Sequence, residues 1–83
     1  MIDRTNSVTL YEWECDKEVT TVALERVTDD GNDLFFIRTS TVPEEFDQEM
    51  TFESGLFEDQ GSAIDMMLKE ISNYMYRWWL AEN

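Results

Sequence analysis

The C-terminal segment of the chain, from Ser62 onward, has the spacing of one long amphipathic helix. Ser62 is the expected N-cap, and Asp65 suits the positive end of the helix dipole. At about 100° per residue, the large apolar side chains fall on one stripe. That stripe comprises Ile64, Met67, Leu68, Ile71, Tyr74, Met75 and Trp78. Such a helix must bury its stripe against another element, so the rest of the chain has to supply a partner surface.

The preceding segments have the composition of β-strands, rich in β-branched and aromatic residues. We expect strands over Ser7–Cys15, Val19–Thr28, Asp33–Thr41 and Glu49–Ser54. The turn Asp29-Asp30-Gly31-Asn32 between two apolar runs predicts a hairpin, because Asp-Gly supplies the positive φ angles it requires. Between the last two strands, Thr41 is the expected N-cap of a short helix. A loop over residues 55–61 then leads to the C-terminal helix.

These elements predict an α+β fold with the order β-β-β-(short α)-β-α, as one domain over residues 1–83. The antiparallel sheet has about four strands, and the long C-terminal helix packs on one of its faces. In the first strand, Tyr11 and Trp13 are expected on one face and Leu10 on the other. The run Leu34–Ile37 is apolar on both faces, so the second face must be covered by the 42–60 segment or by a partner.

The charge of the chain limits its partners more than its fold. It carries 19 acidic and 6 basic side chains, no histidine, and a formal net charge of −13. Direct binding to nucleic acid or to an anionic membrane is disfavoured, because neutralising phosphates requires Lys and Arg. A basic protein surface, such as one that holds DNA or RNA, is the favoured partner. The alternative is that the acidic residues only keep the protein soluble, or adapt it to a high-salt environment.

The acidic side chains form three candidate contact regions. The segment Glu44–Asp59 holds seven carboxylates and no basic residue. Glu12 and Glu14 lie two apart on a strand, about 6.8 Å, a spacing comparable to the charge repeat of a nucleic acid. The acidic residues of the hairpin are the third region, although aspartates are also common in turns for conformational reasons. The predicted acidic contacts are Glu12, Glu14, Asp29, Asp30, Asp33, Glu44, Glu45, Asp47, Glu49, Glu53, Glu58 and Asp59.

Tyr76 and Trp79 are the candidate aromatic anchors of a contact, since Tyr and Trp dominate interface hot spots. Tyr76, Met66 and Leu80 lie off the apolar stripe, and Trp79 lies at its edge. The alternative is that this segment belongs to the core and the end of the helix.

No catalytic, cofactor or metal site is expected. The absence of histidine removes Ser-His-Asp triads and histidine metal ligands, and three glycines form no phosphate-binding loop. The single cysteine, Cys15, favours a reducing, cytoplasmic location. The N-terminus lacks the apolar region of a secretory signal, and no apolar run approaches the ~20 residues that a membrane span needs.

In size, charge and lack of catalytic motifs, the whole chain resembles phage-encoded anti-defence inhibitors, anti-CRISPR proteins and DNA mimics among them. The resemblance implies an inhibitor, acting in the host cytoplasm, that blocks the nucleic-acid site of a CRISPR effector or nuclease. Residues 44–59 would then supply the charge, and Tyr76 or Trp79 the anchor. An immunity protein against a nuclease toxin shares this physical chemistry. A structural or homodimeric acidic protein is the third reading.

Overall fold

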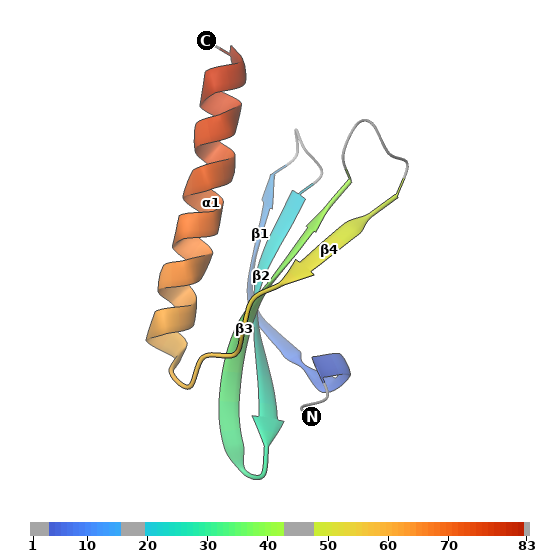
Figure 1. Ribbon diagram of the computed structural model, residues 1–83, viewed down its shortest axis with the longest axis vertical. Helices are drawn as coiled ribbons and strands as arrows, with labels where there is room; N and C mark the ends of the chain where they lie inside the picture. The colour runs from blue at the N-terminus through green and yellow to red at the C-terminus, as the bar shows by residue number, and fades with distance from the viewer. Residues whose placement is uncertain (1–3, 16–19, 43–47, 83) are drawn as a thin grey trace.

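The computed structural model describes residues 4–15, 20–42 and 48–82 of the chain, with side chains as far as residue 76. A 3-10 turn, η1 (Arg4–Asn6), precedes four strands and one helix. These are β1 (Val8–Cys15), β2 (Thr20–Asp29), β3 (Asn32–Thr41), β4 (Met50–Glu53) and α1 (Gln60–Glu82). The strands form an antiparallel sheet in the order β1-β2-β3-β4. The expected α+β class is confirmed, with α1 on one side of the sheet and η1 on the other (Figure 1).

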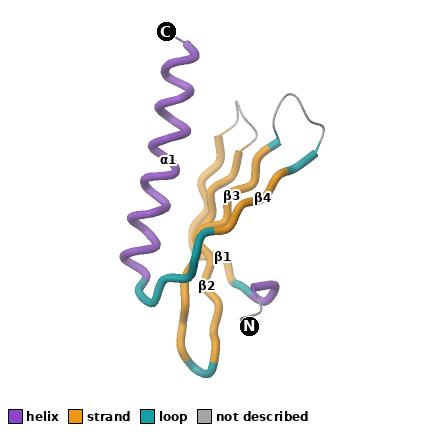
Figure 2. The backbone as a smooth tube through the Cα atoms, viewed as in Figure 1, coloured by secondary structure: helices purple, strands orange, loops and turns teal. Residues whose placement is uncertain are grey.

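The hairpin between β2 and β3 has the turn that the sequence predicts. Asp29 pairs with Asn32, and the two residues between them have positive φ angles, 51° at Asp30 and 80° at Gly31. This conformation suits glycine and is tolerated by aspartate, and its twist matches that of the strands it joins. The hairpin therefore fixes a continuous ten-pair register between β2 and β3. Figure 2 shows the short turn that joins these two strands.

The hydrophobic core lies between the sheet and α1. Its buried members are Val22, Leu24, Phe35, Ile37, Ala63 and Met67, packed by half-buried Ile64, Met66, Ile71 and Tyr74 of α1. Ala63 is fully buried, and its small side chain allows α1 to approach the sheet closely. The expected stripe is partly wrong. Leu68 and Met75 are more than half exposed, while Met66 packs on the core, because the contact is centred on Ala63 and Met67.

The helix begins earlier than the sequence predicts, and a different residue caps it. Asp59 Oδ2 accepts the backbone N–H of Ser62 at 2.8 Å, and Ser62 Oγ donates to Asp59 Oδ1 at 2.8 Å. Asp59 is therefore the N-cap, and Ser62 is the third residue of α1. These two hydrogen bonds to the charged carboxylate lower the pKa of Asp59 below its ordinary value of 3.8.

This cap gives the stability a pH dependence. Because the folded-state pKa of Asp59 is lowered, its contribution is present above the unfolded pKa and is lost as pH falls below about 4. We expect Asp59→Ala to be less stable than the wild type at pH 7, with a smaller difference at pH 2. Urea unfolding of both proteins at the two pH values measures this. A difference that does not shrink in acid would contradict the assignment of the charged cap.

A β-bulge changes the orientation of side chains in β1. Thr9 pairs with Glu25 and Tyr11 with Leu24, so Leu10 is the extra residue of β1. The bulge allows Leu10 and Trp13 to pack against the same core, although their odd spacing places them on opposite faces of a regular strand. The expectation that Leu10 faces away from Trp13 is therefore wrong.

On the sheet face opposite α1, the N-terminal turn covers Phe36. Residues 43–47 of the expected covering segment 42–60 lie outside the described residues. Phe36 on this face is fully buried, with the Arg4 guanidinium 4.8 Å and the Arg38 guanidinium 5.3 Å from its ring centroid. Arg4 also donates to the carbonyl oxygen of Ser54 at 2.8 Å, which fixes η1 over the sheet. Two cations over one aromatic ring thus seal the second apolar face of β3.

A buried carboxylate lies beside this ring. Glu25, with its side chain 3% exposed, accepts an ion-paired hydrogen bond from Arg38 Nη1 at 3.2 Å. The Thr9 hydroxyl lies 2.8 and 2.9 Å from its two carboxylate oxygens. Arg38 also reaches Glu53 Oε2 at 3.0 Å. Burial of the Glu25 charge is therefore compensated by Thr9 of β1 and Arg38 of β3, the two strands beside β2.

The segment after β4 continues along β3 instead of leaving the sheet. The Ser54 hydroxyl accepts the backbone N–H of Ile37 at 2.8 Å, and the Ser54 N–H donates to the Ile37 carbonyl at 2.9 Å. Phe57 then exchanges two backbone hydrogen bonds with Phe35, at 2.9 and 2.7 Å. The expected loop over 55–61 is thus shorter, because α1 already starts at Gln60. Thr41 belongs to β3, and the rest of the expected short helix falls largely outside the described residues.

Candidate acidic binding surface

The pairing of Phe57 with Phe35 brings together acidic residues that are distant in sequence. Since this bridge is antiparallel, the chain just after Phe57 runs beside the chain just before Phe35. Glu58 and Asp59 therefore lie near the β2–β3 hairpin and its aspartates. The exposed carboxylates gathered here, called the acidic end below, are Asp29, Asp30, Asp33, Glu58 and Asp59.

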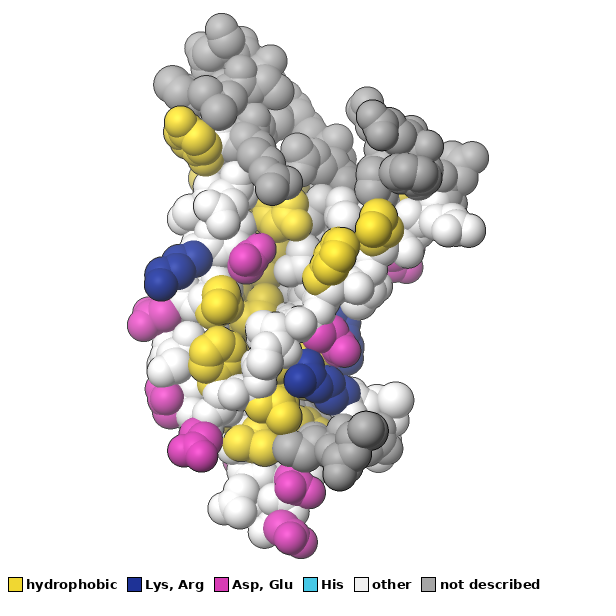
Figure 3. Space-filling model, in the orientation of Figure 1, with side chains coloured by type: hydrophobic (Ala, Val, Ile, Leu, Met, Phe, Trp, Pro, Cys, Tyr) yellow, Lys and Arg dark blue, Asp and Glu magenta, His cyan; other side chains and the backbone are white. Residues whose placement is uncertain are grey.

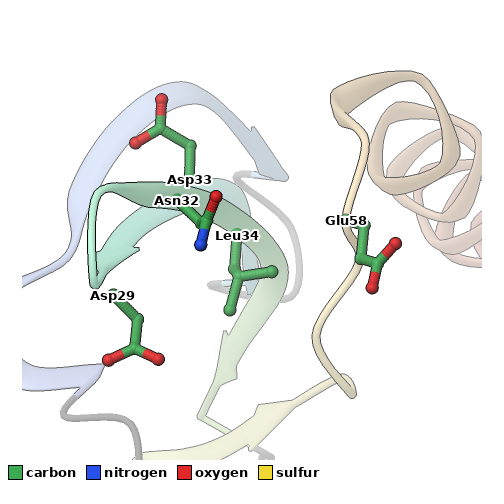
Figure 4. A pocket seen from close by; sticks show the side chains of 5 residues that line it. All are labelled: Asp29, Asn32, Asp33, Leu34 and Glu58. Atoms are coloured by element: carbon green, nitrogen blue, oxygen red, sulfur yellow. The ribbon is translucent and has the colours of Figure 1, made fainter.

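The acidic end contains an open hollow of about 430 Å³. Asp29, Asn32, Asp33 and Leu34 line it from the hairpin, and Glu58 lines it from the segment that leads into α1. Figure 4 shows Glu58 across the hollow from Asp29 and Asn32. The lining thus combines one apolar side chain, Leu34, with three carboxylates. This combination suits a Lys or Arg side chain, which has an apolar stem and a cationic head.

The two segments of the acidic end, residues 29–33 and 58–59, contain no basic residue, and Arg26 is the nearest in sequence, three residues before Asp29. The chain contains no Lys or Arg between Arg26 and Arg38, or between Arg38 and Lys69. Figure 3 shows acidic side chains at the lower end of the molecule, over the hairpin and the start of α1, with no basic side chain among them in that view. Two of these carboxylates have internal roles, since Asp33 accepts from the Thr28 hydroxyl at 2.8 Å and Asp59 caps α1. Asp29 and Glu58 remain as the strongest candidates for contacts with a partner.

The other predicted acidic contacts lie on different parts of the sheet. Glu12 and Glu14 are exposed on β1, on the face opposite α1, because Glu12 shares a row across the sheet with Ala23 and Arg38. Glu53 lies in the same row on β4 and pairs with Arg38, so its charge is compensated internally. Glu49 is exposed next to β4. The predicted contacts therefore do not form one continuous patch.

The remaining predicted contacts have unequal support from the structure. Glu44, Glu45 and Asp47 fall outside the described residues, as does the side chain of Trp79. Tyr76 is 60% exposed on α1, as the helical spacing predicts for a residue off the core stripe. It lies toward the end of the helix that extends beyond the sheet (Figure 1). The role of Tyr76 as an anchor thus remains a prediction. Tyr76 lies about four turns along α1 from the acidic end.

Exposed apolar side chains form a further feature that the sequence only partly predicts. Leu68 and Met75, expected in the core, lie seven residues apart on α1 and share an exposed side of the helix. Tyr11 on β1 and Phe52 on β4 are also more than half exposed, on the two edge strands of the sheet. The helix therefore covers the middle strands of its sheet face and leaves large side chains on both edges accessible.

The described part of the chain lacks a metal-binding group and a membrane-spanning helix. Residues 4–15, 20–42 and 48–82 contain no group of three or more Cys, Asp or Glu side chains placed to hold a metal ion. Within the same ranges, no helix combines the length and the apolar character that crossing a membrane requires.

No protein-family model, curated protein or solved structure matches this chain.

Proposed function

We propose that this protein is an inhibitor that binds a basic surface of a nucleic-acid-handling protein, a CRISPR effector or a nuclease, and blocks its nucleic-acid site. The observation that carries the proposal is the acidic end, where Asp29, Asp33 and Glu58 line a common hollow that has no basic residue in its lining. A groove that holds phosphates offers the Lys and Arg side chains that such a surface requires. We place this action in the cytoplasm, where the free thiol of Cys15 stays reduced.

The fold makes the acidic end effective because it holds the carboxylates in place. The hairpin turn, the Phe35–Phe57 bridge and the Asp59 cap fix three separate segments relative to one another. Charges held on a rigid scaffold lose little conformational entropy on binding. The long-range field of a chain with net charge −13 adds a fast, salt-sensitive encounter with a basic partner.

Displacement of labelled DNA from purified CRISPR effectors and nucleases tests the proposal. We expect the wild type to displace DNA from at least one of them, with a potency that falls as salt rises. Asp29→Asn/Glu58→Gln should lose about tenfold in potency, because it removes two charges that contact the basic surface. Circular dichroism should show the same fold, since both side chains are exposed.

A matched control removes the same charge elsewhere. Asp65→Asn/Glu70→Gln changes two carboxylates of α1 outside the acidic end and should keep nearly the wild-type potency. Equal loss in both double variants would show that only total charge matters and would overturn the assignment to the acidic end. Failure of the wild type to displace DNA from any target at low salt would overturn the inhibitor proposal itself.

A further inference from the structure

The outer edge of β1 is open. β1 is the first strand of the sheet, pairs only with β2, and has eight residues, twice the length of the opposite edge strand β4. No strand in the described ranges pairs with its outer side. After the bulge at Leu10, the segment Tyr11–Cys15 forms a regular ladder with β2, so its outward backbone groups keep strand spacing. An edge of this kind is a template for a further strand.

The side chains of this edge specify what a further strand should carry. Glu12 and Glu14 are exposed on one face, and their partners on β2 are the neutral Ala23 and Thr21. A strand added outside β1 would place its own side chains directly opposite these carboxylates, where Lys or Arg is favoured. On the other face, Tyr11 is 58% exposed and would be covered by an apolar side chain of that strand. The complementary strand therefore alternates basic and apolar residues.

A second copy of the chain does not meet this requirement. Antiparallel pairing of two copies, centred on Glu12, Trp13 or Glu14 with both helices on the same side, sets glutamate opposite glutamate. Like charges directly opposite one another destabilise a strand pair, and each copy also carries a net charge of −13. Charge complementarity thus favours a basic partner segment over self-association.

We propose that the outer edge of β1 binds an extended segment of a partner protein, in which Lys or Arg alternates with apolar residues, by adding it to the sheet as a fifth strand. Backbone hydrogen bonds to β1 hold the segment, and Glu12 and Glu14 select its basic residues. This surface is separate from the acidic end, so the two proposals stand independently.

Titration with a capped peptide of alternating Lys and Val, eight residues long like β1, tests the inference. Hydrogen exchange should show new protection of β1 amides when the peptide binds. Glu12→Gln/Glu14→Gln should weaken binding about three- to tenfold, because two cross-strand charge pairs are lost. Asp29→Asn/Glu58→Gln removes equal charge at the acidic end and should bind the peptide nearly as the wild type does.

A second peptide separates strand addition from simple charge attraction. Replacing each Val with Pro keeps the charge but prevents ladder formation, so its binding should be lost. Equal binding of the two peptides, protection only outside β1, or equal loss in both double variants would overturn the inference. Protection of β1 amides in the free protein that rises with protein concentration would also overturn it, because the edge would then be occupied by a second copy.

Discussion

Phe36→Ala is expected to destabilise the protein by about 3–5 kcal/mol, the usual cost of removing a fully buried aromatic ring. Phe36 has no exposed surface, and its ring is the apolar surface on which Arg4 and Arg38 lie. Its removal leaves a cavity and also frees the N-terminal turn. A domain of this size is stable by only about 5–15 kcal/mol, so a large part of its stability should disappear. Urea unfolding followed by circular dichroism measures the change.

The same substitution at an exposed phenylalanine gives the control. Phe52 on β4 is 55% exposed, and Phe52→Ala should cost only about 0.5 kcal/mol. Phe36→Leu keeps an apolar side chain but removes the aromatic face, and its loss should fall between the two. A Phe36→Ala variant as stable as Phe52→Ala would mean that the face opposite α1 is not sealed in the way described.

Arg38→Ala is expected to cost about 3 kcal/mol, because it leaves the Glu25 carboxylate buried without its cation. The Glu25 side chain is 3% exposed, so its charge is poorly solvated without the cation, and the Thr9 hydroxyl remains as a hydrogen-bond donor to it. The estimate lies at the lower end for buried pairs because the Arg38 side chain is itself 30% exposed. Unfolding in urea at pH 7 measures this loss.

Two further variants separate the buried charge from the loss of Arg38 packing. Glu53→Gln removes the more exposed partner of the same arginine and should cost less than about 1 kcal/mol. Glu25→Leu/Arg38→Met replaces the whole pair by apolar groups and should recover most of the stability. If the double variant is no better than Arg38→Ala, the penalty comes from lost packing over Phe36 rather than from an uncompensated carboxylate.

The elements of the fold follow from local sequence patterns. Period-two segments and the Asp30-Gly31 turn predict the first three strands, and the 3.6-residue period predicts α1. These signals are readable because each depends on residues close together in the chain. The stripe of α1 is less well predicted, because neighbouring wheel positions differ little in hydropathy. The sequence predicts Leu68 and Met75 in the core, whereas both are more than half exposed and α1 contacts the core through Ala63 and Met67.

The sequence predicts which acidic residues are exposed in the hairpin, but it does not predict which distant residues join them. The abundance of acid and the exposed positions of Asp29, Asp30 and Asp33 follow from composition and turn chemistry. The gathering of Glu58 with Asp29 does not, because it depends on the bridge between Phe57 and Phe35. No local pattern marks that bridge, and the sequence predicts that the fourth strand ends at Ser54.

By itself, the sequence determined the charge, the α+β class, the hairpin and the presence of one long helix. The tertiary structure decided the rest: the bulge at Leu10, the covering of Phe36 by Arg4, the burial of Glu25 beside Arg38 and the assembly of the acidic end. The physical reason is the distance along the chain over which each kind of interaction acts. Backbone preference and periodicity act over a few neighbouring residues, whereas burial, ion pairing and strand register depend on which distant segments the packed core brings into contact.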